Sequence, residues 1–293
     1  MTSLWVLLHV AAQRDYELHS MDFNTAFLQG SLHEEIWLRR PPGFTGSFPA
    51  GNQWSLRRPV YGLRQAPREW HDTLRTTLFA LRFSPSTVDP SLFLRTDTSL
   101  PSFYILVYIL QRFRFQFSLP QPTPLSTSHS LSAPPSDESV EPSGPTSGLG
   151  LKLGGRGLVV LIGLANATWV DDLATQQLSQ GYTFSLGSGF VSRRSTRSSS
   201  VLSSSCEAEI YTGAMAAKEL RWLTYLLTDL GEKPRRQQGH DRLVSQRGQL
   251  RLAYVATRAN TADIFTKALS PGDHQRFSTV LGLVPTLPHL LSA

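Results

Sequence analysis

Three carboxylate side chains stand at positions where they could serve as metal ligands. Asp22 follows residues 17–21, which we expect to form a strand, Glu209 lies near the start of a long helical pattern, and Asp263 lies near the start of the final helices. Carboxylate oxygens suit Mg²⁺, and two such ions side by side can activate an attacking oxygen and stabilise a leaving phosphate. Taken one by one, each residue also has a simpler interpretation: a turn residue, a helix-surface residue and a capping-turn residue, respectively.

Basic residues outnumber acidic ones, which bears on the kind of partner. Lys and Arg total 28 against 22 Asp and Glu, so the formal net charge is +6 and the sequence pI is about 9.7. A positive balance favours contact with a polyanion such as nucleic acid, although many basic proteins bind none. Four arginines close in sequence either contact phosphates or form solvated surface: Arg57, Arg58, Arg64 and Arg68.

The composition changes along the 293 residues, which are enough for two modest domains. Residues 1–117 and 151–293 look globular, whereas residues 118–150 are rich in Pro, Ser, Thr and Gly and are expected to be a disordered linker. The single cysteine, Cys206, cannot build a disulfide framework or a zinc cluster, which favours an intracellular setting. Residues 4–12 are apolar but too few to span a bilayer, so we expect no signal peptide, no transmembrane segment and a location in the cytoplasm or nucleus.

Residues 151–293, called here the third zone, alternate strands with helices. Strands are expected at residues 157–164 and 249–256, and a hairpin is expected from residues 181–186 and 189–194 around Gly187-Ser188. A long helix should follow residues 203–205 and end at Gly231, and Asn260 could cap a helix over residues 261–269. Apolar side chains of the long helix fall on one expected face: Ile210, Ala214, Ala217, Leu220, Leu223 and Leu227. This order predicts an α/β layered domain.

Two motifs in residues 1–117, called here the first zone, resemble those of a known enzyme family. Residues 21–30 (MDFNTAFLQG) are similar to the first catalytic motif of copia-type retrotransposon reverse transcriptases, and residues 60–70 (VYGLRQAPREW) are similar to the second. Residues 41–44 (PPGF), which lie between them, also fit. The resemblance implies that Asp22 binds a catalytic metal ion and that Phe27 lies under the sugar and selects deoxynucleotides. It also implies that other residues of the second motif contact template or phosphates, among them Gln65 and Arg64.

The same family carries a second carboxylate pair on a hairpin that reads Tyr-Val-Asp-Asp. Here the matching strand, residues 103–109, is followed by Leu110, Gln111 and Arg112, so no carboxylate stands at that position. One remaining ligand residue cannot hold two metal ions about 4 Å apart. The WVDD sequence at residues 169–172 is not the missing pair, because it lies beyond the linker and its flanks are polar.

Four segments of the third zone resemble the copia-type ribonuclease H domain, namely residues 166–169 (NATW), 179–184 (SQGYTF), 203–209 (SSSCEAE) and 260–269 (NTADIFTKAL). That enzyme class cuts the RNA strand of an RNA–DNA hybrid with four carboxylates around two divalent metal ions. The resemblance implies that Glu209 is the second carboxylate and Asp263 the fourth. The first position holds Asn166, whose amide brings no negative charge, and nothing in residues 231–248 resembles the element that carries the third.

These observations predict an α/β (α+β) protein, with a partial reverse-transcriptase palm followed by a truncated ribonuclease H-like domain. The resemblance breaks after residue 109, around residues 146–151 and around residues 238–245, which indicates internal deletions or spliced-out coding sequence. We expect Mg²⁺ as the family's cofactor, two incomplete sites and no catalysis by this chain. Expected partners are RNA, DNA or an RNA–DNA hybrid, and no membrane. The sequence predicts no particular oligomeric state. Two alternatives remain: a non-catalytic nucleic-acid-binding remnant, and the non-functional product of a pseudogene.

Overall fold

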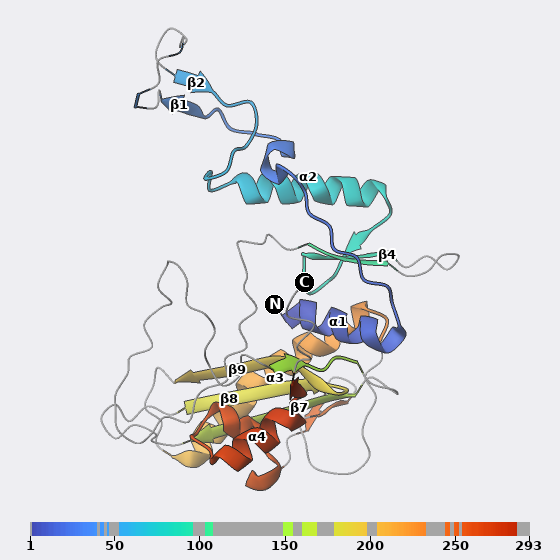
Figure 1. Ribbon diagram of the computed structural model, residues 1–293, viewed down its shortest axis with the longest axis vertical. Coiled ribbons are helices and arrows are strands. Elements are labelled where there is room, and N and C mark those ends of the chain that lie inside the picture. Colours follow the sequence, from blue (N-terminus) through green and yellow to red (C-terminus); the bar gives the residue numbers. More distant parts are fainter. Residues whose placement is uncertain are drawn as a thin grey trace. The chain divides into compact units, whose positions relative to one another are not determined.

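The computed structural model describes residues 2–39, 42–43, 46, 53–95, 103–107, 149–154, 160–168, 179–197, 204–232, 244–246, 249–251 and 254–285. The chain divides into two compact units, which are called here the first unit (Leu18–Gln111) and the second unit (Met1–Glu17 together with Arg112–Ala293). Both units mix helices with antiparallel strands (Figure 1), which confirms the α+β class expected from the sequence.

The first unit is built around helix α2 (Ala66–Ala80), which begins with a proline in its first turn. Trp70, Leu74 and Leu78 recur every four residues on α2 and pack against Phe83 and Phe93 to form its core. The strands and the short helix of this unit are η1 (Ala26–Gln29), the antiparallel pair β1 (Trp37–Arg39) and β2 (Gln53–Ser55), and the antiparallel sheet β3 (Ser84–Pro85), β4 (Leu92–Arg95) and β5 (Phe103–Leu106).

The second unit is built around the antiparallel sheet of β7 (Leu161–Thr168), β8 (Ser179–Leu186) and β9 (Gly189–Arg197), in that order. Two further strand pairs are β6 (Leu149–Leu151) with β12 (Leu283–Pro285), and β10 (Val244–Gln246) with β11 (Gln249–Arg251). Its helices are α1 (Thr2–Arg14), α3 (Ser205–Asp229), η2 (Thr257–Ala259), η3 (Thr261–Phe265) and α4 (Pro271–Val280).

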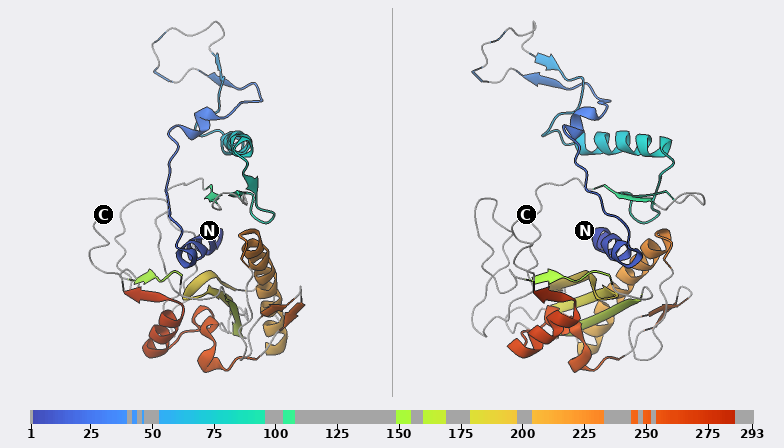
Figure 2. Two further views of the ribbon diagram at one scale, coloured as in Figure 1. Left: turned by 90° about the vertical axis from the view of Figure 1, so that its right-hand side faces the viewer. Right: turned by 45° about the vertical axis from the view of Figure 1, so that its right-hand side comes forward.

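The two faces of the central sheet pack against different helices. Side chains alternate between the faces of a strand. Ser192 of β9 donates a hydrogen bond to Glu219 of α3 at 2.5 Å. Three residues further along the same strand, Ser195 donates to the backbone carbonyl of Phe265 in η3 at 2.6 Å. The sheet therefore lies between α3 on one face and η3 on the other (Figure 2).

Local signals set the ends of the long helix α3. The side chain of Ser204 accepts a hydrogen bond from the backbone N–H of Glu207 at 3.2 Å, which satisfies a donor that the first turn leaves open. At the other end Gly231 adopts a positive φ of 74°, a conformation that glycine reaches without strain. The helix runs between the two signals that the sequence contains.

Several expected elements are confirmed. The hairpin around Gly187-Ser188 is present as β8 and β9, the long helix is present as α3, and the side chain of Asn260 accepts from the backbone N–H of Ala262 as a cap. Residues 103–106 form β5, whereas residues 108–112, the residues 169–172 and most of the expected linker lie outside the described residues. The last two linker residues, 149 and 150, belong to β6.

The strand expected at residues 17–21 is wrong. These residues form no regular structure, because β5 pairs with β4 and the described part of the chain offers them no partner strand. Without a partner the apolar side chains stay in solvent, as the 76% exposure of Met21 illustrates. Asp22 therefore follows an exposed segment that forms no strand, and it does not stand at the end of a strand.

Strand and helix limits in the second unit also differ from expectation. The strand expected at residues 157–164 is described as Leu161–Thr168, which pairs with β8 along its whole length, whereas residues 155–159 lie outside the described part of the chain. The strand expected to reach residue 256 ends at Arg251, where its pairing with β10 ends. The helix expected over residues 261–269 is a short 3₁₀ turn, since the backbone N–H groups of Thr266 and Lys267 share the carbonyl of Asp263.

The expected apolar face of α3 is wrong in its first half. Ile210 is 64% exposed and Ala214 is exposed, whereas Leu220, Leu223 and Leu227 are buried as expected. Small or polar side chains take the buried positions of the first turns instead, namely Ala208, Thr212, Gly213 and Ala216. The spacing of large apolar residues gave the wrong buried face for this half of α3, because small residues contact the sheet there.

No helix in the described ranges combines the length and the apolar character that are needed to cross a bilayer.

Candidate metal positions in the second unit

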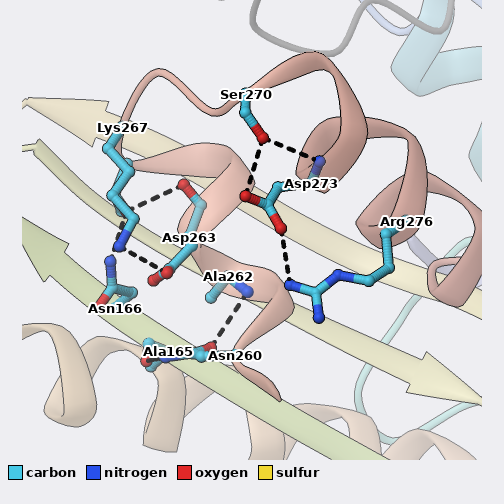
Figure 3. Close-up of polar contacts among 10 residues, drawn as sticks. Ala165, Asn166, Asn260, Ala262, Asp263, Lys267, Ser270, Asp273 and Arg276 are labelled. Carbon is cyan, nitrogen blue, oxygen red and sulfur yellow. Dashed lines mark hydrogen bonds and ion pairs between the residues drawn. The ribbon is translucent and has the colours of Figure 1, made fainter. Parts of the chain in front are cut away.

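Asn260 fixes the 3₁₀ turn η3 against the central sheet. Its amide oxygen accepts from the backbone N–H of Ala262 at 3.1 Å, while its amide nitrogen donates to the backbone carbonyl of Ala165 in β7 at 3.0 Å. All five residues of η3 are buried, so the turn is held both by packing and by these two hydrogen bonds. This anchoring places Asp263 beside strand β7 (Figure 3).

The carboxylate of Asp263 forms a short ion pair with Lys267. The distance between Nζ of Lys267 and Oδ2 of Asp263 is 2.6 Å, and the Asp263 side chain is only 3% exposed. A buried carboxylate is costly unless a positive charge and hydrogen bonds compensate it. The ammonium group of Lys267, which is about one-third exposed, supplies that compensation from within the same segment.

Asn166 of β7 is linked to the same place through Thr266. Its amide nitrogen donates to the hydroxyl of Thr266 at 2.6 Å, and that hydroxyl donates in turn to the backbone carbonyl of Asp263 at 3.3 Å. Figure 3 shows Asn166, Asp263 and Lys267 gathered at the edge of η3. The structure thus brings together the residues expected at the first and fourth carboxylate positions.

Glu209 lies in the second turn of α3, and its side chain is exposed. The described residues contain no group of three or more His, Cys, Asp or Glu side chains that could hold a metal ion. The carboxylate of Asp263 is paired with an ammonium group, which donates hydrogen bonds and cannot serve as a metal ligand, and the amide N–H of Asn166 donates to Thr266. These residues do not fit a divalent metal ion.

The candidate residues of the first unit differ in their surroundings. Asp22 is exposed, whereas Phe27 packs on the core of the unit with its ring 4.6 Å from that of Tyr61. The amide nitrogen of Gln65 donates to Glu34 at 3.2 Å, and the side chain of Arg64 is exposed. Phe27 is therefore part of the packed core, and the contact of Gln65 with Glu34 occupies its amide.

Sequence reasoning missed two charged partners in the second unit. Lys267 was part of the motif, and its spacing of four residues from Asp263 is the signal that could have revealed the pair. Glu232 is 5% exposed and forms a two-armed ion pair with Arg14, at 2.7 Å and 2.9 Å. These two residues are 218 positions apart, so no local pattern could have indicated their contact.

Comparison with known proteins identifies relatives for both parts of the chain. Residues 1–111 match the family model described as reverse transcriptase (RNA-dependent DNA polymerase). Two Arabidopsis thaliana proteins, the retrovirus-related Pol polyproteins from transposons RE2 and RE1, are 25% and 24% identical over 98% of this chain. The putative transposon Ty5-1 protein of Saccharomyces cerevisiae is 35% identical over 30% of this chain and 29% of its own length. No solved structure matches this chain.

The lengths of these matches are informative. The chain spans 29% of the length of the two Arabidopsis relatives. The match to RE2 runs over 425 residues although this chain has 293, so at least 132 aligned positions (425 less 293) are gaps in this chain. An alignment that covers 98% of this chain and yet contains this many gaps agrees with the internal breaks expected from the sequence.

Proposed function

Because residues 1–111 belong to the reverse transcriptase family and the chain is related along its length to copia-type retrotransposon Pol polyproteins, we propose that it is an internally deleted Pol fragment without catalytic activity. In this proposal the first unit derives from the polymerase. The second unit derives from a ribonuclease H domain. The partners are RNA, DNA or an RNA–DNA hybrid.

Element order and residue types support a ribonuclease H origin for the second unit. Three antiparallel strands precede a long helix that carries Glu209, and a C-terminal turn carries Asp263 beside the first strand. Asn166 stands on that first strand, where the family has its first carboxylate. The Asn166 amide and the backbone carbonyl of Asp263 contact the same threonine hydroxyl, which supports an arrangement in which the family's first and fourth carboxylate positions lie close together.

The single observation that carries the proposed inactivity is the Asp263–Lys267 ion pair. A positive ammonium group 2.6 Å from Oδ2 repels a divalent cation and occupies the oxygen that would have to bind it. Asn166 adds no charge to the site, and Glu209 is exposed. Two ions held close together need several carboxylates to offset their mutual repulsion, and the described residues supply no such group.

The first unit supports the same conclusion from its sequence. Asp22 is the one carboxylate at a family metal-binding position, and Leu110, Gln111 and Arg112 stand where the family has its Asp-Asp pair. Asp22 also lies on an exposed segment outside any strand. We therefore propose that Mg²⁺ does not support polymerisation in this chain.

A retained role in nucleic-acid binding would rest on charge. The net charge of +6 favours association with a polyanion, and each phosphate contact makes affinity fall with rising salt. Among the arginines of the first unit, Arg58 already donates to the backbone carbonyl of Leu28 at 3.1 Å, whereas Arg64 is exposed. Such binding is a family-level expectation and requires no metal ion.

The test is a pair of assays on the full-length chain, primer extension on an RNA template and cleavage of an RNA–DNA hybrid, each with Mg²⁺ and with Mn²⁺. We expect no product above the level of a metal-free control. Activity that disappears in Asp22→Asn or in Glu209→Gln, but persists in the surface controls Asp72→Asn and Glu35→Gln, would overturn the proposal. Salt-dependent binding to the hybrid, measured in parallel, separates an inactive binder from a chain that does not engage nucleic acid at all.

A further inference from the structure

Helix α1 belongs to one part of the chain by sequence and to the other part by packing. Its residues fall within the stretch that matches the reverse transcriptase family model, residues 1–111. In the structure, however, Met1–Glu17 group with the second unit and not with the residues that follow them. Figure 2 shows α1 lying over the central sheet of the second unit.

One face of α1 is buried against the second unit. Val6, Val10 and Ala11 are at most 2% exposed, and His9 is fully buried with them. Their spacing of one, three and four residues is that of a single helix face. Because an isolated helix of 13 residues is marginal in water, this packing is what stabilises α1.

Glycines on the second unit allow α1 to approach closely. A Cβ atom on Gly154, which has a φ of +76°, would lie 2.9 Å from the Cβ of Ala12. A Cβ on Gly189 would meet the carbonyl oxygen of Lys152 and would lie 3.4 Å from Cε1 of His9. A larger side chain at Gly154 would push the helix away, and at Gly189 the helix already lies in van der Waals range of the added atom, so this surface fits a helix at this distance.

An ion pair holds the end of α1. Nε and Nη2 of Arg14 lie 2.7 Å and 2.9 Å from the two carboxylate oxygens of Glu232, which lies just beyond the Leu230 and Gly231 that follow α3. Glu232 is buried, and two parallel hydrogen bonds define the geometry of the pair. Arg14 is also in the last turn of α1, where a positive charge is favourable.

We propose that the second unit contains a helix-binding surface whose occupant is residues 2–14 of this chain. The surface is formed by strand β9, the glycines Gly154 and Gly189, and the carboxylate of Glu232. Binding α1 there removes it from the polymerase-related segment that it precedes. The second unit thereby includes a helix from the stretch that matches the reverse transcriptase family model, whether or not the chain is catalytic.

Hydrogen–deuterium exchange on the full-length chain tests the proposal, because the backbone amides of α1 are protected only while the helix is docked. Arg14→Glu and Glu232→Arg should each raise the exchange rate of the amides of residues 6–14 by about tenfold, and the double variant should restore protection. Val10→Ala should raise exchange in both α1 and β9, whereas Val280→Ala, at a position 63% exposed on α4, should change neither.

The charge reversal Arg68→Glu, at an exposed position of helix α2 in the first unit, is the matched control and should leave the exchange of α1 unchanged. Unaltered α1 exchange in Glu232→Arg, or a double variant as unprotected as its single parents, would overturn the proposal. A variant that unfolds altogether would lose protection in β7 and β8 as well. For that reason the comparison of Val10→Ala with Val280→Ala, two substitutions that remove little side-chain volume, provides a second measurement of exchange in α1.

Discussion

Nζ of Lys267 lies 2.6 Å from Oδ2 of Asp263, a carboxylate that is 3% exposed and that stands where the family expectation places a metal ligand. The relationship gives the buried charge a partner from within the chain. A metal ion would have to displace the ammonium group before it could bind.

Replacing Lys267 by Met should destabilise the second unit, since it leaves the Asp263 carboxylate buried without a positive partner. Breaking a fully buried pair costs roughly 3–5 kcal/mol, and the one-third exposure of Lys267 reduces this to about 1–3 kcal/mol. Urea denaturation measures the change, with Lys218→Met on the exposed side of α3 as control. The double variant Asp263→Asn with Lys267→Met should recover part of the loss. Equal stability of Lys267→Met and the wild type would contradict the role given to this pair.

A metal site should appear when charge is returned to the cluster. Asn166→Asp combined with Lys267→Met places two carboxylates beside Thr266 and removes the competing ammonium. We expect this double variant to bind Mn²⁺ more tightly than the wild type, by about tenfold or more, as seen by isothermal titration calorimetry. Addition of Asp263→Asn should abolish the gain. A gain that survives this third substitution would show that the ion binds elsewhere.

Asn260 should stabilise the position of η3 through both the nitrogen and the oxygen of its side-chain amide. Asn260→Ala loses the cap on Ala262 and the hydrogen bond to the carbonyl of Ala165, at an expected cost of about 1–2 kcal/mol. Asn260→Asp keeps the cap acceptor but loses the donor, so its unfolding free energy should fall between those of Asn260→Ala and the wild type. If Asn260→Asp were as unstable as Asn260→Ala, the cap would contribute nothing.

The stability of the second unit should depend on pH through His9. Burial lowers the pKa of His9 from 6.5 to about 4, so the folded state binds fewer protons than the unfolded state between these values. Its contribution to stability is therefore complete above pH 6.5 and decreases as the pH is lowered toward 4, by up to about 3 kcal/mol.

Chemical denaturation between pH 7 and pH 4 measures the slope of this pH dependence. His9→Leu should reduce the slope, while His33→Asn, at a site whose side chain is 78% exposed, should keep it. Other groups contribute to the pH dependence as well, so the difference between wild type and His9→Leu is the informative quantity. An identical slope in the two proteins would rule out His9 as its source.

Local signals in the sequence predicted much of the second unit. The turn residues Gly187-Ser188, the cap at Ser204 and the cap at Asn260 act within a few residues of themselves, and the elements that they delimit are present. The same reasoning failed at residues 17–21, because a strand exists only where a partner offers its hydrogen-bonding edge.

The candidate site was predicted in part for the same reason. Asn166 and Asp263 were identified from the motifs, and the structure brings them to the same threonine. The ion pair of Asp263 with Lys267 could have been inferred only from the spacing of four residues between them. The pairing of Arg14 with Glu232 depends on how distant segments pack, and no sequence pattern contains that information.

The number of Mn²⁺ ions bound by the full-length wild-type chain tests the central claim most directly. Electron paramagnetic resonance at neutral pH counts free Mn²⁺ while the protein is titrated into a fixed amount of the ion. The account predicts that all of the Mn²⁺ signal remains that of the free ion. Two ions bound per chain, with the spin coupling that arises when they lie close together, would contradict it.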